Sequence, residues 1–179
     1  MKIGFDLDKI FIDYPPFVPS ELINRLYKQK SNGLLLYRIP SKLEQIIRVI
    51  SHYPFLRPPI VENIQFVEHL AKNKKHNYYL ISSRFSFLKY RTELIIKKYN
   101  LEKIFDAMIF NFKDKQPHLF KTQAIRELKI DRYVDDDLPL LEFTAQNNQK
   151  TKFFWLNQNQ SKQLSKNLFA IMNLAEMFK

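Results

Sequence analysis

The sequence of 179 residues contains no cysteine, only two glycines and no long uninterrupted apolar run. Without cysteine, neither a disulfide framework nor a thiolate metal site nor a cysteine nucleophile is available, which fits a reducing cytoplasm. Asp6, Asp8 and Lys9 interrupt the N-terminal segment, so it does not have the form of a signal peptide. Nowhere do about 18 apolar residues run together, as a membrane-spanning helix requires. We therefore expect a soluble, cytoplasmic protein with no membrane partner.

Basic residues outnumber acidic ones, with 29 Lys and Arg against 18 Asp and Glu and a formal net charge of +11. Such a balance favours an anionic partner. The basic residues are scattered, however, and the densest group, at 72–76, has the form of a solvated helix end. The abundance of Lys, Asn, Ile, Phe and Tyr indicates a compositional bias, and we find no recognised nucleic-acid-binding module. Nucleic acid is therefore a conceivable partner but not the favoured one.

The length and the 45% hydrophobic content suit one domain with a small insertion. Five short runs are nearly continuous in apolar residues, as strands buried on both faces should be. These runs are 2–7, 77–82, 107–111, 131–135 and 152–156. Amphipathic helices are expected at 60–73, 85–100, 118–129 and 161–178. The alternation predicts an α/β fold, a Rossmann-like three-layer sandwich around a mainly parallel five-stranded sheet.

Residues 14–56 interrupt this alternation. Ser20 is suited to cap a short helix, and Ser41 to open a second helix that ends before Pro54. Two helices without a strand between them predict a small helical cap at 14–56, set on a core formed by 1–13 and 57–179. The candidates to face a cleft are Tyr14, Phe17, Arg38 and Arg48 in this cap, and Arg57, which directly follows the cap.

Polar residues follow several of the predicted strands. Asp6 and Asp8 follow the first, Ser82 ends the second, and Asp135 and Asp136 follow the fourth. In an open parallel sheet, ligands bind outside the carboxyl ends of the strands, so these side chains should meet at one edge. Converging carboxylates repel one another unless a cation lies among them, and Mg²⁺ prefers carboxylate and water ligands. The acids therefore predict a Mg²⁺ site.

Four segments carry a family resemblance when taken in order: "FDLDK", "YYLISSR", "FKTQAI" with Lys121, and "YVDDD". They resemble the four motifs of the haloacid dehalogenase-like hydrolase superfamily, and residues 14–56 lie where members insert a helical cap of the first type. The resemblance implies a Mg²⁺-dependent phosphatase that hydrolyses a small phosphomonoester, of the nucleotide or sugar phosphate class, through an aspartyl-phosphate intermediate.

The same resemblance implies a role for each motif residue. Asp6 would attack phosphorus, and Asp8 would act as general acid and then as general base. Ser82 and Lys121 would hold the phosphoryl oxygens. Mg²⁺ would be bound by Asp6, by Asp135 or Asp136, and by the backbone carbonyl of Asp8.

Several alternatives remain open in the sequence. Ser83 can replace Ser82 if the strand ends one residue later, and Lys115 in "KDKQP" can replace Lys121. Lys9 stands where the family commonly has Thr or Val, which keeps open a binding or regulatory protein that has lost turnover. The net positive charge keeps open a phosphatase that acts on nucleic-acid ends.

Two further acids are left out of the predicted site. Asp137 is expected to cap a helix that runs from about 138, and Asp13 to belong to the turn into the cap.

Overall fold

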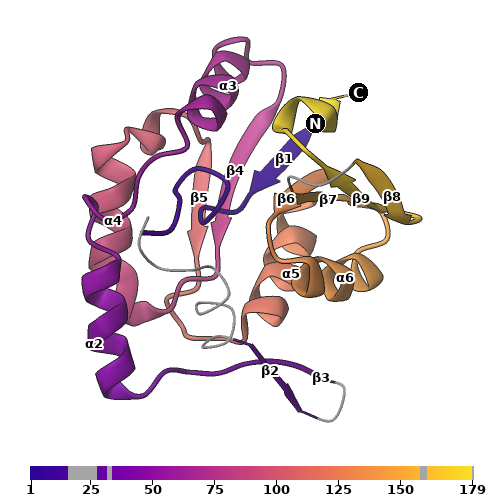
Figure 1. Ribbon diagram of the computed structural model, residues 1–179. Helices are drawn as coiled ribbons and strands as arrows, with labels where there is room; N and C mark the ends of the chain where they lie inside the picture. The colour runs from indigo at the N-terminus through magenta and orange to yellow at the C-terminus, as the bar shows by residue number, and fades with distance from the viewer. Residues whose placement is uncertain (16–27, 32–33, 158–160, 179) are drawn as a thin grey trace.

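The computed structural model describes residues 1–15, 28–31, 34–157 and 161–178 (Figure 1). In this part of the chain the main sheet has seven strands in the order β5-β4-β1-β6-β7-β9-β8. All neighbouring pairs are parallel except β9 and β8. The bounds are β1 Lys2–Phe5, β4 Asn77–Ser82, β5 Ala107–Phe110, β6 Arg132–Asp135, β7 Lys152–Leu156, β8 Lys162–Ser165 and β9 Leu168–Ile171.

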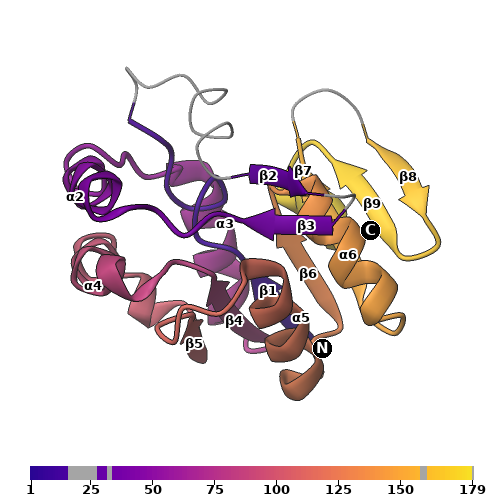
Figure 2. The same ribbon diagram turned by 90° about the horizontal axis from the view of Figure 1, so that it is seen from below.

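Helices cover both faces of the sheet, so the fold is the predicted three-layer α/β sandwich. On one face, α3 and α4 pack against Phe5 and Leu80. On the other, α5 and α6 pack against Ile81, Tyr133 and Phe153 (Figure 2). The bounds are α3 Val61–Lys72, α4 Lys89–Lys98, α5 Pro117–Leu128 and α6 Leu138–Asn147, with short 3₁₀ turns η1 Ser86–Leu88, η2 Leu101–Lys103 and η3 Leu174–Phe178.

The predictions of five strands and of a helix at 161–178 are wrong. That segment forms the β8–β9 hairpin followed by η3, which brings the sheet to seven strands. Strand β9 pairs with the edge of β7 from Phe153 to Leu156 and thereby satisfies backbone groups that would otherwise be unpaired. Asn167, in the turn between β8 and β9, anchors this hairpin to the core. Its side-chain amide lies within hydrogen-bonding distance of three carbonyl oxygens at the end of α6 and in the loop after it. This tertiary pairing overrides the helical spacing of the apolar residues.

The inserted segment contains more than helices. The expected helix from Ser20 lies largely outside the described residues, and its described end, Lys28–Ser31, is strand β2, paired antiparallel with β3 at Leu34–Tyr37. The second expected helix is confirmed as α2, Lys42–Ser51. Its capping box is formed by Ser41 and Glu44. Figure 1 shows α2 and the β2–β3 hairpin at the same end of the molecule.

None of the helices in the described part of the chain has the length and apolar character needed to cross a membrane.

Candidate active site

Two neighbouring parallel strands bring the acids together. Strand β6 pairs with β1, so Asp135 at the end of β6 lies beside Asp6, which directly follows β1. Carboxylate oxygens of Asp6, Asp135 and Asp136 lie within 4.8 Å of one another. Asp6 and Asp135 are buried, and Asp136 is half-buried. The chain therefore holds three carboxylates at the carboxyl edge of its sheet, where the sequence predicts them.

Lys121 on α5 lies between two of these acids. Its Nζ donates hydrogen bonds to Oδ1 of Asp6 at 2.8 Å and to Oδ2 of Asp135 at 2.6 Å, and its side chain is almost fully buried. Lys115 lies elsewhere, because its Nζ donates to the side chain of Gln123 at the surface. Of the two lysines, Lys121 is the one that the fold brings to the acids.

Negative charge exceeds positive charge at this cluster. Burial raises the pKa of Asp6 to about 7, against its ordinary value of 3.8, and nearby Asp135 adds to the rise although Lys121 opposes it. Burial and the charges of Asp135 and Asp6 likewise place the pKa of Asp136 well above its ordinary value. The pKa of Lys121 is raised by Asp135 and Asp6 despite burial, so it stays charged. Three clustered carboxylates, only partly neutralised by one ammonium group, are a donor set that fits a hard divalent cation.

Asp135 is held from two sides in addition to Lys121. The Tyr133 hydroxyl donates to its Oδ2 at 3.1 Å, and the backbone N–H of Asp137 donates to its Oδ1 at 3.1 Å. Tyr133 reaches this position by lying close against β1: a Cβ at Gly4 would come within 2.8 Å of its ring. Glycine at position 4 therefore makes room for the tyrosine that orients Asp135.

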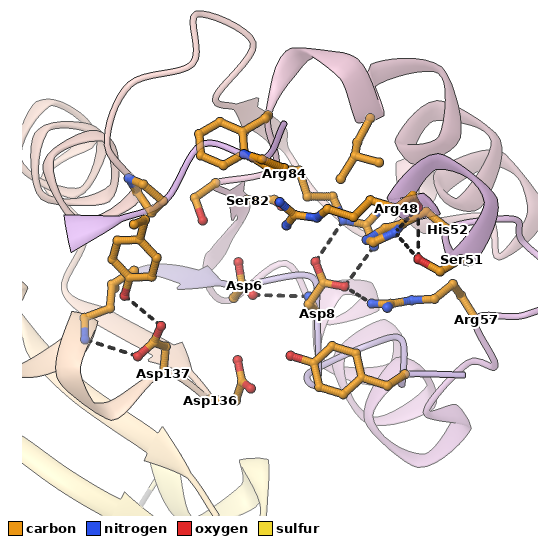
Figure 3. Close-up of a pocket in the computed structure, with 18 of the residues that line it drawn as sticks. Asp6, Asp8, Arg48, Ser51, His52, Arg57, Ser82, Arg84, Asp136 and Asp137 are labelled. Carbon is orange, nitrogen blue, oxygen red and sulfur yellow. Dashed lines mark hydrogen bonds and ion pairs between the residues drawn. The ribbon is translucent and has the colours of Figure 1, made fainter. Parts of the chain in front are cut away.

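Asp8 lies beside the cluster but is bound by arginines (Figure 3). Arg84 donates from Nε and Nη2 to the two carboxylate oxygens, both at 2.8 Å, and Arg57 also pairs with Oδ1. Although burial alone would raise the pKa of Asp8, the two guanidinium groups hold it well below its usual range. Arg84 is itself fixed by a 3.2 Å hydrogen bond to Thr92. In this arrangement Asp8 is an ionised carboxylate with no proton to donate.

The remaining sequence candidates fall into three groups. Ser82 and Ser83 both line the cleft, so the choice between them stays open. Lys9 is directed to Asp13, with Nζ 2.6 Å from Oδ1, and so does not point into the acid cluster. Phe17 lies outside the described residues.

A cleft of about 510 Å³ opens over the acids, between the core and the insert. Tyr14, Arg38, Arg48 and Arg57 line it, as predicted for residues facing a cleft. The cleft residues to which the sequence analysis assigned no role include Tyr37, His52 and Arg84.

The sequence signals for these three differ. Arg84 follows a strand in "SSR", which marks its place, but nothing in the sequence pairs it with Asp8. Tyr37 and His52 lie in the insert without any motif. His52 is buried, and burial together with Arg84 and Arg57 places its pKa well below the ordinary value, so it is neutral.

Comparison with solved structures identifies the fold. A protein from Bacteroides fragilis assigned as a haloacid dehalogenase-like hydrolase superposes with a TM-score of 0.62 at 13% identity, over 98% of each chain. A protein from Thermotoga maritima assigned as a beta-phosphoglucomutase gives 0.61 at 15% identity, over 98% of this chain and 95% of that one. The chain therefore has the haloacid dehalogenase-like fold, and the resemblance seen in its four motifs is confirmed at the level of the fold.

A further similarity is to a chain of the Pnkp1/Rnl/Hen1 RNA repair complex, with a TM-score of 0.51 and 16% identity over 87% of this chain and 42% of that chain. No protein-family model and no curated protein sequence matches this chain.

Proposed function

We propose that the protein is a Mg²⁺-dependent phosphatase that hydrolyses a small phosphomonoester, of the nucleotide or sugar phosphate class, through an aspartyl-phosphate on Asp6. The observation that carries the proposal is the buried Asp6–Lys121–Asp135 cluster with Asp136 beside it, at the floor of an open cleft. A purely structural role would not require three carboxylates and one ammonium group at the floor of a cleft.

In the proposed reaction, an oxygen of Asp6 forms a bond to phosphorus while the bond from phosphorus to the ester oxygen breaks. The oxygen of a water molecule then forms a bond to phosphorus while the bond from phosphorus to Asp6 breaks. Both water protons leave on the released dihydrogen phosphate, and the Asp6 carboxylate is restored. Lys121 and Ser82, which line the cleft, would hold phosphoryl oxygens in both steps. Mg²⁺ held by Asp6, Asp135 and Asp136 would offset the repulsion between the attacking carboxylate and the phosphate.

Asp8 determines which leaving groups the site can expel. With both its oxygens paired to Arg84 and one of them also to Arg57, it has no proton to give to a leaving alkoxide. An aryl oxide leaves without protonation, whereas an alkyl ester requires at least one arginine to withdraw from Asp8. The first substrate to test is therefore an aryl phosphate.

The proposed function is tested by aryl phosphate hydrolysis, followed by release of the aryl oxide with Mg²⁺ and with a chelator. We expect turnover in Mg²⁺ that the chelator abolishes, because the excess of carboxylates repels the phosphate when no cation is bound. If Mg²⁺ stabilises the fold but neither aryl phosphates nor a panel of metabolite phosphates are hydrolysed, the protein is a binding module that has lost turnover.

The pH dependence of Mg²⁺ binding follows from the raised pKa of Asp6 and Asp136. A carboxyl whose pKa is higher in the folded than in the unfolded state takes up a proton on folding, so Asp6 makes the metal-free fold lose stability as the pH rises from about 4 to about 7. The raised pKa of Asp136 acts in the same direction. Mg²⁺ competes with those protons. We expect the Mg²⁺-dependent rise in Tm to be larger at pH 8 than at pH 6 in thermal denaturation. An equal rise at both pH values would contradict proton competition at this cluster.

A second candidate function is a phosphatase acting on nucleic-acid ends. It is favoured by the net charge of +11 and by the similarity to a chain of an RNA repair complex. Oligonucleotide binding that weakens steeply with salt would support it, and weak binding even at low salt would count against it.

A further inference from the structure

Strands β2 and β3 form a hairpin within the inserted segment. Among the side chains of this hairpin that the structure describes, Tyr37 on β3 contacts the core. The side chain of Gln116, which precedes α5, accepts from the Tyr37 backbone N–H at 3.0 Å and donates to its carbonyl at 3.1 Å. The Tyr37 ring stacks on His118 in the first turn of α5, with ring centroids 6.0 Å apart. Tyr37 is 8% exposed, so this end of the hairpin is firmly docked.

The Tyr37 hydroxyl reaches the loop that carries the metal-site acids. It donates to Oδ2 of Asp137 at 2.7 Å, a charge-assisted hydrogen bond. The other carboxylate oxygen of Asp137 accepts from the backbone N–H of Leu140 at 3.3 Å and so caps α6. The Asp137 side chain is thus held by the insert on one side and by a core helix on the other.

The backbone of Asp137 is in turn hydrogen bonded to the acid cluster. Its backbone N–H donates to Oδ1 of Asp135 at 3.1 Å, and Asp136 lies between the two. The orientation of the 135–137 loop therefore depends on a hydrogen bond that comes from the insert. Without the Tyr37 hydroxyl, one oxygen of a half-buried carboxylate would lose a donor close to Asp135 and Asp136.

We propose that Tyr37 is a positioning residue: by hydrogen bonding to Asp137, it couples docking of the inserted hairpin to the geometry of the carboxylates that bind the divalent cation. This inference rests on the proposed function, since it assigns a role to a residue outside the cluster for the same site. It also assigns the β2–β3 hairpin a role at the site.

The test compares Mg²⁺ binding and turnover in Tyr37→Phe, Asp137→Asn and the double variant. Phenylalanine keeps the ring that stacks on His118, and asparagine keeps a side-chain oxygen that can cap α6. Tyr90→Phe, at an exposed tyrosine on α4, is the matched control. The Mg²⁺ concentration at half-maximal thermal stabilisation reports on binding without any need for turnover.

For Tyr37→Phe we expect that concentration to rise about tenfold and kcat/KM with an aryl phosphate to fall by a similar factor, with Tyr90→Phe unchanged. The double variant should show little loss beyond that of either single variant, because both remove the same charge-assisted hydrogen bond. Additive losses, or unchanged Mg²⁺ affinity in Tyr37→Phe, would overturn the inference and leave the proposed function standing. If Mg²⁺ neither stabilises nor activates the native protein, the proposed function and the inference both fail.

Discussion

Replacing Asp6 with asparagine is expected to reduce Mg²⁺-dependent phosphatase activity by at least about 10⁴-fold, as loss of a nucleophile does in other enzymes. An amide oxygen neither attacks phosphorus at a useful rate nor contributes a full negative charge to the metal site. The measurement is the initial rate of aryl phosphate hydrolysis at saturating Mg²⁺. Mass spectrometry of the acid-quenched native enzyme should also detect a phosphoryl group on the peptide that contains Asp6.

The same substitution should leave the metal-free protein at least as stable as the native chain. Burial and the neighbouring Asp135 both raise the pKa of Asp6, so removing its charge relieves an unfavourable burial. A Tm no lower than that of the native protein would therefore separate lost chemistry from lost folding. Asp13→Asn is the matched control, because Asp13 pairs with Lys9 outside the acid cluster. If Asp6→Asn keeps more than about one hundredth of the native rate, Asp6 is not the nucleophile.

The sequence predicts the centre of the fold better than its periphery. The runs at β1, β4 and β6 are buried on both faces, so their apolar character is decided locally, and the acids follow from where those strands end. The segment 161–178 is different, because its pairing partner, the edge of β7, is set by tertiary structure. Helical spacing of apolar residues in that segment carried no information about the unpaired edge.

The site shows the same division between local and long-range information. Asp6, Asp135 and Lys121 each occupy a motif with its own place on a strand or helix, and the fold brings all three together. The two arginines on Asp8 lie 49 and 76 residues away along the chain, and the Tyr37–Asp137 hydrogen bond spans 100. The two arginine pairs form when the segments of the core pack together, and the Tyr37–Asp137 pair forms when the insert docks on the core, so a single sequence contains no pattern that identifies them.

Lys121→Met is expected to make the fold depend on a divalent cation. Methionine keeps much of the apolar stem but removes the ammonium group that lies 2.8 Å from Asp6 and 2.6 Å from Asp135. Breaking a buried ion pair from one side costs about 3–5 kcal/mol, because the remaining charges stay buried without a partner. We expect the metal-free variant to lose roughly that much free energy of unfolding at pH 8, and its activity to fall about 10³-fold.

Two dependences distinguish this effect from ordinary loss of packing. Mg²⁺ should restore most of the lost stability, since a cation among the carboxylates replaces the missing charge. The deficit should also be smaller at pH 6 than at pH 8, because the buried carboxyls have raised pKa values and take up protons as the pH falls. Lys115→Met, at the surface lysine paired with Gln123, should show neither dependence.

A Lys121→Met protein whose metal-free Tm at pH 8 matches that of the native chain would mean that the carboxylates are not ionised together. The excess of negative charge on which the proposed Mg²⁺ site depends would then be absent.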